Sequence, residues 1–269
     1  MCNRTHLIIG AGKMGGALIK GWIHSSVLTP EQIVIIDPNP GEEALKAIKS
    51  GALHLKTIDK KIRNIRTTIL AIKPQKIDEI SISLGKYLPQ KSLIISILAG
   101  TKIQKLQEIF KTHAIVRAMP NTPSSLGKGI TCFAKNSLVN TNQIQEIMKL
   151  FQAVGKVYEL DNEILINTIT GISGSGPAYL FYLVETLELA AIENGLSKDI
   201  ASIIARETII GSAALLENSS YTPSELRKNV TSPKGTTEAA LKILMGKNGL
   251  EKLIHDTVDA AIKRSKNLE

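Results

Sequence analysis

The residues that decide the fold are Leu7-Ile8-Ile9-Gly10-Ala11-Gly12-Lys13-Met14-Gly15, a short apolar run followed by the pattern G-x-G-x-x-G. Behind it, Leu18, Ile19, Trp22 and Ile23 recur at helical spacing. Glycines between a strand and a helix let the chain turn sharply, let a pyrophosphate approach the backbone and let helix and strand pack closely. We expect a dinucleotide-binding turn, the alternative being a tight turn without a ligand. The expected cofactor-binding residues are Gly10, Ala11, Gly12, Lys13, Met14 and Gly15.

The same alternation continues over the first part of the chain. Further strands are expected at 33–36, 68–72, 92–97, 114–118, 129–134 and 156–160. Continuous runs rich in β-branched residues, separated by helix-length segments, are typical of βαβ units in a parallel sheet. The sequence therefore predicts an α/β fold in which residues 1–161 form a Rossmann-type, doubly wound and mostly parallel sheet.

After residue 161 only helical spacing is found. The expected helices cover 162–194, 197–218, 223–229, 236–246 and 249–267. Gly171–Pro177 interrupts the first of them, and because proline removes a helical hydrogen bond we expect a kink there. The helices carry wide apolar faces, more than a small bundle buries. We therefore expect residues 162–269 to be an all-α domain through which two chains interlock, as a homodimer or a dimer-based oligomer.

Composition limits the class of protein. Of the 269 residues, 43% are hydrophobic and 21% charged, which is typical of a soluble globular protein. No apolar run approaches the roughly 20 residues that span a bilayer, so no membrane segment is expected. The net charge of +9 fits either a lysine-rich solvated surface or a protein that handles small anions. The lysines are scattered and no aromatic residues alternate with them, so nucleic-acid binding is not expected.

Cysteine and histidine indicate neither a disulfide framework nor a metal site. Cys2 and Cys132 have no metal-ligand spacing, and no secretory segment fits before Gly10, so a cytoplasmic location is expected. The histidines share no spacing that would suggest a metal. They are His6, His24, His54, His113 and His255.

Asp37 closes the second apolar run, about 20 residues beyond the glycine pattern, where an acidic residue accepts the ribose hydroxyls of NAD. Because Pro38 follows it, an Asx-turn is the alternative role. On chemistry alone the carboxylate favours NADH, since it repels a 2′-phosphate.

A second unusual stretch is Val230-Thr-Ser-Pro-Lys-Gly-Thr-Thr237, which leads into a helical pattern far from the strands. Its small residues are explained either by capping of the helix by Ser232 or Thr236, or by an anion bound to the N–H groups and dipole of the helix start. Capping accounts for one hydroxyl but not for Gly235 and two threonines together, which favours the anion.

Six stretches, in the right order over the whole chain, resemble those of the pyrroline-5-carboxylate reductase family. They are Gly10–Gly15, Ala71–Pro74, Ser96–Gly100, Arg117–Pro123, Gly171–Tyr179 and Leu226–Thr237. The last stretch, with its doubled threonine, is close to a family signature. Two residues depart from the pattern. Lys234 stands where many members have glycine, and Asp37 stands where relatives that favour NADPH often carry a small neutral or hydroxyl residue.

The resemblance implies reduction of the cyclic imine of 1-pyrroline-5-carboxylate to L-proline by a hydride from NAD(P)H, the last step of proline biosynthesis. It implies that Thr237 is the catalytic residue, which hydrogen-bonds the ring nitrogen. The implied substrate-binding residues are Asn229, Ser232, Gly235, Thr236 and Thr237. The further cofactor-binding residues are Asp37, Asn39, Ala71, Ile72, Lys73, Pro74, Ala99, Gly100 and Asn121.

Two other functions fit part of the sequence. A 3-hydroxyacid dehydrogenase of the 6-phosphogluconate type has a catalytic lysine after a similar glycine-serine-glycine stretch, where Tyr179, Leu180 and Phe181 stand here. A non-catalytic nucleotide sensor would not need Ser232–Thr237. Between the cofactors, the resemblance and the basic surplus favour NADPH, whereas Asp37 alone favours NADH. We therefore expect NADPH, with NADH as the alternative.

Overall fold

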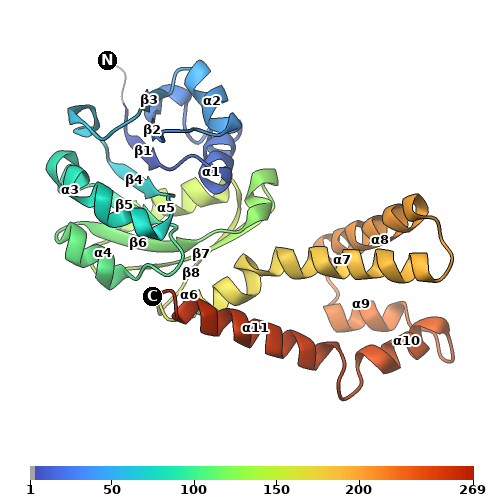
Figure 1. Cartoon of the computed structure of the whole chain (residues 1–269). Coiled ribbons are helices and arrows are strands. Elements are labelled where there is room, and N and C mark those ends of the chain that lie inside the picture. Colours follow the sequence, from blue (N-terminus) through green and yellow to red (C-terminus); the bar gives the residue numbers. More distant parts are fainter. Residues whose placement is uncertain (1–3) are drawn as a thin grey trace. The chain divides into compact units, whose positions relative to one another are not determined.

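The chain separates into two units in the computed structural model, which describes residues 4–269 (Figure 1). The first, which we call the sheet unit, extends to Ser175 and also includes Ala261–Glu269, and the second, the helical unit, is Gly176–Ala260. The sequence boundary after residue 161 marks where strands give way to helices. The sheet unit continues past it because α6 (Leu165–Ile169) contacts the sheet.

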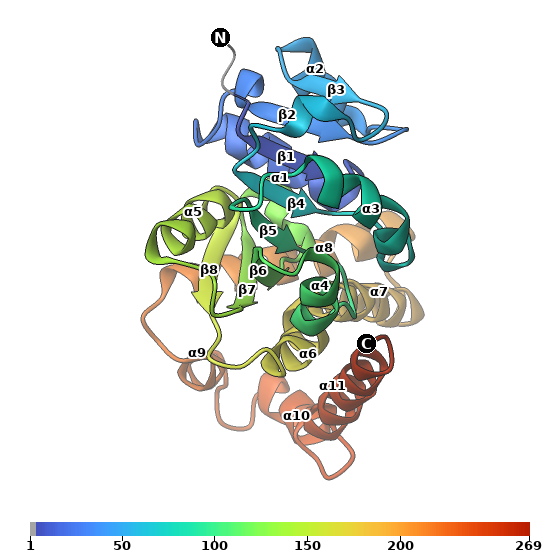
Figure 2. The ribbon, with the colours of Figure 1, turned by 90° about the vertical axis from the view of Figure 1, so that its left-hand side faces the viewer.

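Within the described residues, the sheet unit is built on one sheet of eight strands in the order β3-β2-β1-β4-β5-β6-β7-β8 (Figure 2). The strands are β1 His6–Ile9, β2 Ile33–Ile36, β3 Leu53–Leu55, β4 Thr67–Leu70, β5 Leu93–Ser96, β6 Ala114–Met119, β7 Gly129–Lys135 and β8 Gly155–Glu159. Every neighbouring pair is parallel except β6 and β7, so the mostly parallel, Rossmann-type sheet is confirmed. The strand order reverses between β1 and β4, and sheets of this kind bind ligands at that switch point.

The sequence analysis did not anticipate β3, the edge strand beside β2. Its three residues place polar His54 between two leucines and form no continuous apolar run. The strand pairs in parallel with Val34–Ile36 of β2, and His54 Nε2 lies 2.9 Å from the carbonyl oxygen of Asp37. An edge strand this short forms because it pairs with the neighbouring strand, and its own sequence pattern contributes little.

Apolar side chains project from both faces of the sheet and form one core on each face. Successive strand residues point to opposite faces, so Ile8 joins one core while Leu7 and Ile9 join the other. The helices of the first core are α1 (Lys13–His24), α2 (Glu42–Lys49) and α5 (Thr141–Gln152). Those of the second are α3 (Ile77–Tyr87), α4 (Ile103–Phe110) and α6. Figure 2 shows α5 on one side of the strands and α3 and α4 on the other, which is the doubly wound layering expected.

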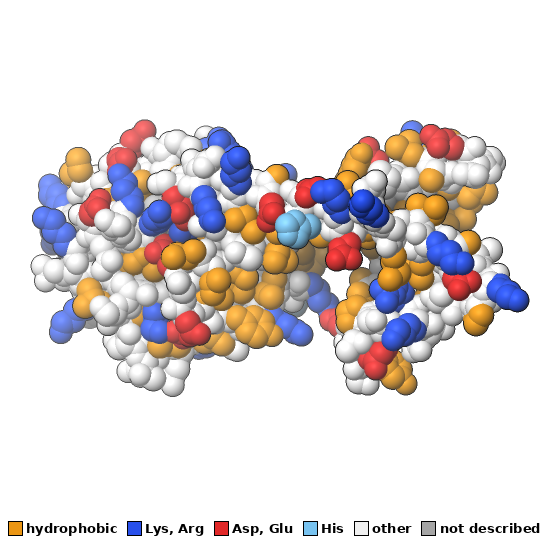
Figure 3. All heavy atoms as spheres, turned by 90° about the horizontal axis from the view of Figure 1, so that it is seen from below, with side chains coloured by type: hydrophobic (Ala, Val, Ile, Leu, Met, Phe, Trp, Pro, Cys, Tyr) orange, Lys and Arg blue, Asp and Glu red, His pale blue; other side chains and the backbone are white. Residues whose placement is uncertain are grey.

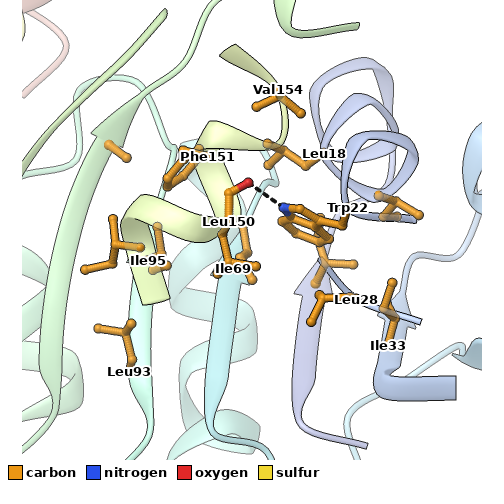
Figure 4. Close-up of a cluster of buried hydrophobic side chains, with 14 of the residues drawn as sticks. Leu18, Trp22, Leu28, Ile33, Ile69, Leu93, Ile95, Leu150, Phe151 and Val154 are labelled. Atoms are coloured by element: carbon orange, nitrogen blue, oxygen red, sulfur yellow. Dashed lines mark hydrogen bonds between the residues drawn. The ribbon is translucent and has the colours of Figure 1, made fainter. Parts of the chain in front are cut away.

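Trp22, the only tryptophan of the chain, joins α1 to α5 (Figure 4). Its ring is buried in the same core as Ile69 and Phe151. The indole N–H donates to the carbonyl oxygen of Leu150 at 2.9 Å. A buried donor without an acceptor costs about 1–3 kcal/mol, so this bond fixes the ring's orientation as well as the contact between the helices.

The helical segment that follows the sheet is interrupted where the sequence predicts it. Thr170–Gly174 form a π-helical turn between α6 and α7 (Gly176–Glu193). The N–H of Ser175 donates to the carbonyl of Thr170, five residues back, at 2.8 Å. Pro177 then lies in the first turn of α7, where a residue without an N–H forfeits no helical hydrogen bond. The interruption is therefore a π-helical turn before the proline.

The helical unit has little apolar core of its own. Its helices are α7, α8 (Lys198–Asn218), α9 (Pro223–Asn229), α10 (Thr236–Leu244) and the first part of α11 (Leu250–Lys266). The last four follow the predicted ranges closely. Among its side chains α8 buries only Ala201 and Ala205, while Phe181 and Ile203 are 67% and 62% exposed. Figure 3 shows apolar side chains on this unit, at the right. Such a surface is typical of an interface with another chain.

His6, His54 and His113 of the sheet unit have structural partners. His6 Nε2 lies 2.5 Å from Glu146 Oε1, and His113 Nδ1 lies 2.8 Å from a backbone carbonyl oxygen. Over residues 4–269, no group of three or more His, Cys, Asp or Glu side chains gathers where it could hold a metal ion. Cys132 is a free, buried thiol whose pKa is raised by burial, and Cys2 lies outside the described residues. No helix in the described part of the chain is both long and apolar enough to cross a bilayer.

Candidate active site

A cavity of about 620 Å³ opens at the carboxyl ends of β1, β2 and β4. This is the switch point of the sheet, where dinucleotides bind in folds of this order. The expected cofactor residues that line the cavity are Gly10, Gly12, Asp37, Asn39, Ala71, Ile72 and Lys73. The folded chain thus brings together residues from three different turns of the sequence.

Each glycine of the first turn has its own geometric role. Gly10 has a φ of +92°, which favours glycine, and a Cβ there would lie 2.4 Å from the carbonyl oxygen of Ala71. A Cβ at Gly15 would lie 2.2 Å from the carbonyl oxygen of Gly10, so α1 packs directly on the turn that follows β1. A Cβ at Gly12 would have no atom within 4 Å. Only Gly12 therefore leaves open space beside the backbone for a ligand.

The carboxylate of Asp37 faces the glycine turn. Its Oδ2 accepts the N–H of Ala11 at 2.6 Å, and its Oδ1 accepts the N–H of Asn39 at 2.8 Å. The second bond is the Asx-turn that the sequence left as an alternative. The first bond ties the loop after β2 to the residue between Gly10 and Gly12. Asp37 also lines the cavity, and its contact with a ribose stays a prediction.

Other expected cofactor residues support the turn or extend from it. Ala11 and Gly15 are buried, Lys13 is exposed and Met14 is half-buried at the start of α1. Pro74 begins the short 3-10 turn that follows β4. These residues shape the cavity without lining it.

Ala99, Gly100 and Asn121 are not among the described residues that line the cavity. The side chain of Asn121 is already bonded to the backbone, since Nδ2 donates to the carbonyl of Ser173 at 3.2 Å and Oδ1 accepts an N–H at 2.9 Å. At Gly100, with a φ of +70°, a Cβ would lie 2.6 Å from the carbonyl oxygen of Leu268. Contact of these three residues with a cofactor stays a prediction.

Sequence reasoning missed Lys56, Lys76 and Glu79, which also line the cavity. Lys56 follows β3, and the other two lie around the start of α3, in segments without a recognisable motif. With Lys73 they give the lining three cations against the carboxylates of Asp37 and Glu79. This balance favours an anionic ligand. Only the folded chain brings these charges together.

The second expected site lies in the helical unit, in the turn between α9 and α10. The N–H of Gly235 donates to the carbonyl of Ser232 at 3.1 Å, which closes the turn. A Cβ on Gly235 would lie 2.5 Å from the Ser232 hydroxyl oxygen, so a side chain there would force the serine hydroxyl to move. Lys234 has a φ of +60°, and its N–H donates to Glu238 Oε2 at 2.8 Å.

The start of α10 keeps backbone donors without acceptors. The first helical bond runs from Ala239 to the carbonyl of Gly235 at 3.2 Å. In the described chain neither an acceptor atom nor a capping side chain contacts the N–H groups of Thr236 and Thr237. Capping by Ser232 or Thr236 is therefore not observed. Three N–H groups were expected to bind an anion. That of Gly235 donates inside the turn instead. Those of Thr236 and Thr237 remain free at the positive end of the helix dipole.

Basic side chains line a separate hollow of the helical unit. This hollow of about 480 Å³, between α9 and α10, is lined by Arg227, Lys228 and Lys242, with Glu238 as the carboxylate. Asn229 ends α9 and is exposed. Lys242 lies in the last turn of α10, and Met245 follows that helix, so the hollow is directed toward the end of α10. The free backbone donors at the start of α10 are therefore the feature of this unit that suits a small anion.

Two sequence profiles match the chain. One, described as pyrroline-5-carboxylate reductase dimerisation, matches residues 163–268, and the other, described as NADP oxidoreductase, coenzyme F420-dependent, matches residues 6–100. The first match includes the whole helical unit, and the second includes the glycine turn and strands β1 to β5.

Relatives match over nearly the whole chain. A pyrroline-5-carboxylate reductase of Synechocystis sp. is 37% identical over 262 residues, which cover 97% of each chain. The solved structure of a pyrroline-5-carboxylate reductase from Coxiella burnetii has a TM-score of 0.91 at 32% identity and covers 99% of each chain. A Plasmodium falciparum pyrroline carboxylate reductase, solved with NADP bound, has a TM-score of 0.85 at 28% identity, covering 100% of this chain and 99% of that one.

We predict that Lys234→Gly stabilises the turn before α10. A side chain in the left-handed region costs about 1–2 kcal/mol, and the greater freedom of glycine in the unfolded chain offsets about half of that gain, so the free energy of unfolding should rise by about 0.5–1 kcal/mol. Urea unfolding measures the change. Lys247→Gly, at a turn position outside the left-handed region, is the matched control and should not stabilise. A Lys234→Gly variant less stable than the wild type would show that the lysine side chain stabilises the turn by more than the strain costs.

Proposed function

The chain belongs to the pyrroline-5-carboxylate reductase family, and from that premise we propose that it reduces the C=N bond of 1-pyrroline-5-carboxylate to give L-proline, using NAD(P)H. The observation that carries the proposal is the turn Ser232–Thr237, which leaves backbone donors without acceptors at the start of α10. A nucleotide sensor would need the glycine turn but not this second site. A 6-phosphogluconate-type dehydrogenase would need a lysine where α7 carries Tyr179–Phe181.

The cavity of the sheet unit is proposed to hold the nicotinamide cofactor, which supplies the hydride when bound. Gly12 gives the pyrophosphate access to the backbone, because a ligand meets open space there. Asp37 and Asn39 border the part of the cavity expected to take the adenosine ribose. Lys56 and Lys76 add positive charge for phosphate groups.

The substrate carboxylate is proposed to bind at the start of α10. The N–H groups of Thr236 and Thr237 donate to it, and the Ser232 hydroxyl and the Asn229 amide supply further donors. Two backbone donors and the helix dipole favour a negative charge and set the direction of the carboxylate, while the missing side chain at Gly235 lets the turn close against Ser232.

The chemistry demands placement more than acid catalysis. A protonated imine is already electrophilic, so the chain has to hold its carbon in line with the hydride and its nitrogen in place. The N–H of the imine donates to the hydroxyl oxygen of Thr237, which sets the orientation of the ring. Correct placement of two reactants can supply about 7–11 kcal/mol of the barrier reduction. After transfer, the nitrogen is the secondary amine of proline.

Activity is tested by following NADPH and NADH oxidation after 1-pyrroline-5-carboxylate is added. We predict that Thr237→Ala lowers kcat/KM by an amount equivalent to about 1–3 kcal/mol, the cost of one hydrogen bond to a polar substrate. Because the carboxylate keeps its backbone contacts, activity should fall without vanishing. Thr257→Ala, which removes an exposed helical threonine bonded to its own backbone, is the control. Wild-type kinetics in Thr237→Ala would remove this hydroxyl from the mechanism.

Cofactor preference is proposed to be NADPH, with NADH also usable. We predict that Asp37→Ser raises the ratio of kcat/KM for NADPH to that for NADH, because a carboxylate repels the 2′-phosphate and can hold a ribose diol. The same change removes the bond from Asp37 to the N–H of Ala11. Absolute rates can therefore fall with both cofactors, and the ratio is the quantity to measure. A strong wild-type preference for NADH would defeat the proposal, and an unchanged ratio in the variant would show that Asp37 does not face the ribose.

The assembly is proposed to be a homodimer, or an oligomer of dimers, joined through the helical unit. The exposed apolar side chains of α7 and α8 support this, because a water-facing surface of that kind is costly. We predict that sedimentation at micromolar concentration shows no active monomer. A stable and active monomer would contradict the proposal.

A further inference from the structure

Arg117 is charged but buried, with a side chain that is 1% exposed. It lies on β6 between Ile115 and Met119, whose side chains belong to the second core. Its Nη1 lies 3.0 Å from Glu163 Oε1 and 2.9 Å from Glu269 Oε1. Nε and Nη2 have no hydrogen-bond partner in the described chain. A buried cation is stable only where carboxylates compensate its charge. The guanidinium of Arg117 therefore holds the carboxylates of Glu163 and Glu269 in place.

Both carboxylates also hold the start of α4. Glu163 Oε1 accepts the N–H of Ile103, the first residue of that helix, at 2.8 Å. Glu269 Oε2 lies 3.0 Å from the ammonium of Lys102, the residue before it. The loop between β5 and α4, residues 97–102, is therefore tied at its far end to the buried guanidinium.

Residues Ser265–Glu269, which we call the strap, reach this place through further bonds. Ser265 Oγ donates to Asn167 Oδ1 at 2.7 Å, and Asn167 Nδ2 donates to Glu269 Oε1 at 3.0 Å. The backbone of Leu268 covers Gly100, where a Cβ would come within 2.6 Å of the leucine carbonyl oxygen. The strap thus lies directly against the middle of the β5–α4 loop.

The ionisation of Glu269 suits this role. Burial raises the pKa of its carboxyl, but hydrogen bonds from Arg117, Lys102 and Asn167 outweigh burial, and the pKa lies below its ordinary value. The carboxylate is therefore charged at neutral pH. Its side chain is 8% exposed, so the contacts are largely shielded from solvent.

The β5–α4 loop follows the strand beside β4, whose end borders the cofactor cavity. The N–H of Ile97 donates to the carbonyl of Leu70 in β4 at 3.0 Å, which joins the loop to that edge. In sheets of this order the adenosine half of the cofactor lies at the end of β2, and the nicotinamide half extends toward the opposite half of the sheet. The loop held by the strap is therefore on the nicotinamide side.

We propose that the strap Ser265–Glu269 positions the nicotinamide half of the cofactor by fixing the β5–α4 loop to Arg117. The identity of the cofactor rests on the proposed function. Glu269 is a positioning residue that acts through the loop. Its loss should leave the adenosine half bound as before, because Gly12 and Asp37 line the cavity and no residue of the β5–α4 loop does.

The test compares Glu269→Gln with the wild type in the absence of substrate. Glutamine keeps an oxygen for Arg117 but loses the charge. We expect the affinity for NADPH to fall about five- to tenfold, since one charged contact is lost. The affinity for 2′-phospho-ADP-ribose, which lacks nicotinamide, should change by less than about twofold, within the range of mutations that touch no shared contact. Asp161→Asn, an exposed carboxylate before α6, is the matched control and should change neither affinity.

Lys102→Met provides a second variant in case Glu269→Gln fails to fold, because Lys102 is half exposed. It removes the ion pair between strap and loop but leaves Glu269 paired with Arg117, and it should weaken NADPH binding while sparing 2′-phospho-ADP-ribose. Equal losses for both ligands, or no loss for either, would overturn the proposal. Because these measurements need no substrate, they decide it even if the wild type does not reduce 1-pyrroline-5-carboxylate. With substrate, kcat should fall in the same variants.

Discussion

The approach of Gly15 to the carbonyl oxygen of Gly10 is the contact on which the rest of the sheet unit depends. There is no room for a single carbon atom between them, since a Cβ would come within 2.2 Å. This closeness seats α1 on the end of β1 and directs Trp22 toward α5. It also leaves Gly12 outermost, with free space beside its backbone. The close approach of Gly15 to Gly10 thus accounts both for the packing of α1 on the core and for the space that a ligand can enter at Gly12.

The two units are stabilised in different ways. In the sheet unit, apolar side chains on both faces of the sheet are buried, and the buried guanidinium of Arg117 is compensated by Glu163 and Glu269. In the helical unit, α7 and α10 bury none of their residues. Hydrophobic burial is the main favourable term in folding. The helical unit therefore needs a partner surface to gain the stabilisation that the sheet unit finds within one chain.

Sequence patterns predicted what is local or repeated. The strands with continuous apolar runs, the four later helices and the glycine turn all follow from neighbouring residues. The edge strand β3 did not, because its three residues form no run of their own. Lys56 and Lys76 reach the cavity only through the arrangement of β3 and α3. The pairing of Arg117 with Glu269 joins residues 152 positions apart, and no motif spacing reports a contact of that range. The turn Ser232–Thr237, the proposed carboxylate site, was recognisable because its small and hydroxyl residues are concentrated in six adjacent positions.

The hydrogen-bonded tryptophan has a practical consequence for following this protein in solution. Trp22 is the sole indole of the chain and is buried between α1 and α5. Intrinsic emission excited at the red edge, where tyrosine does not absorb, therefore arises from one known place in the sheet unit. It is silent about rearrangements confined to the helical unit. A fluorescence signal and a circular dichroism signal, the latter weighted toward helices, would consequently separate the opening of one unit from the melting of the other.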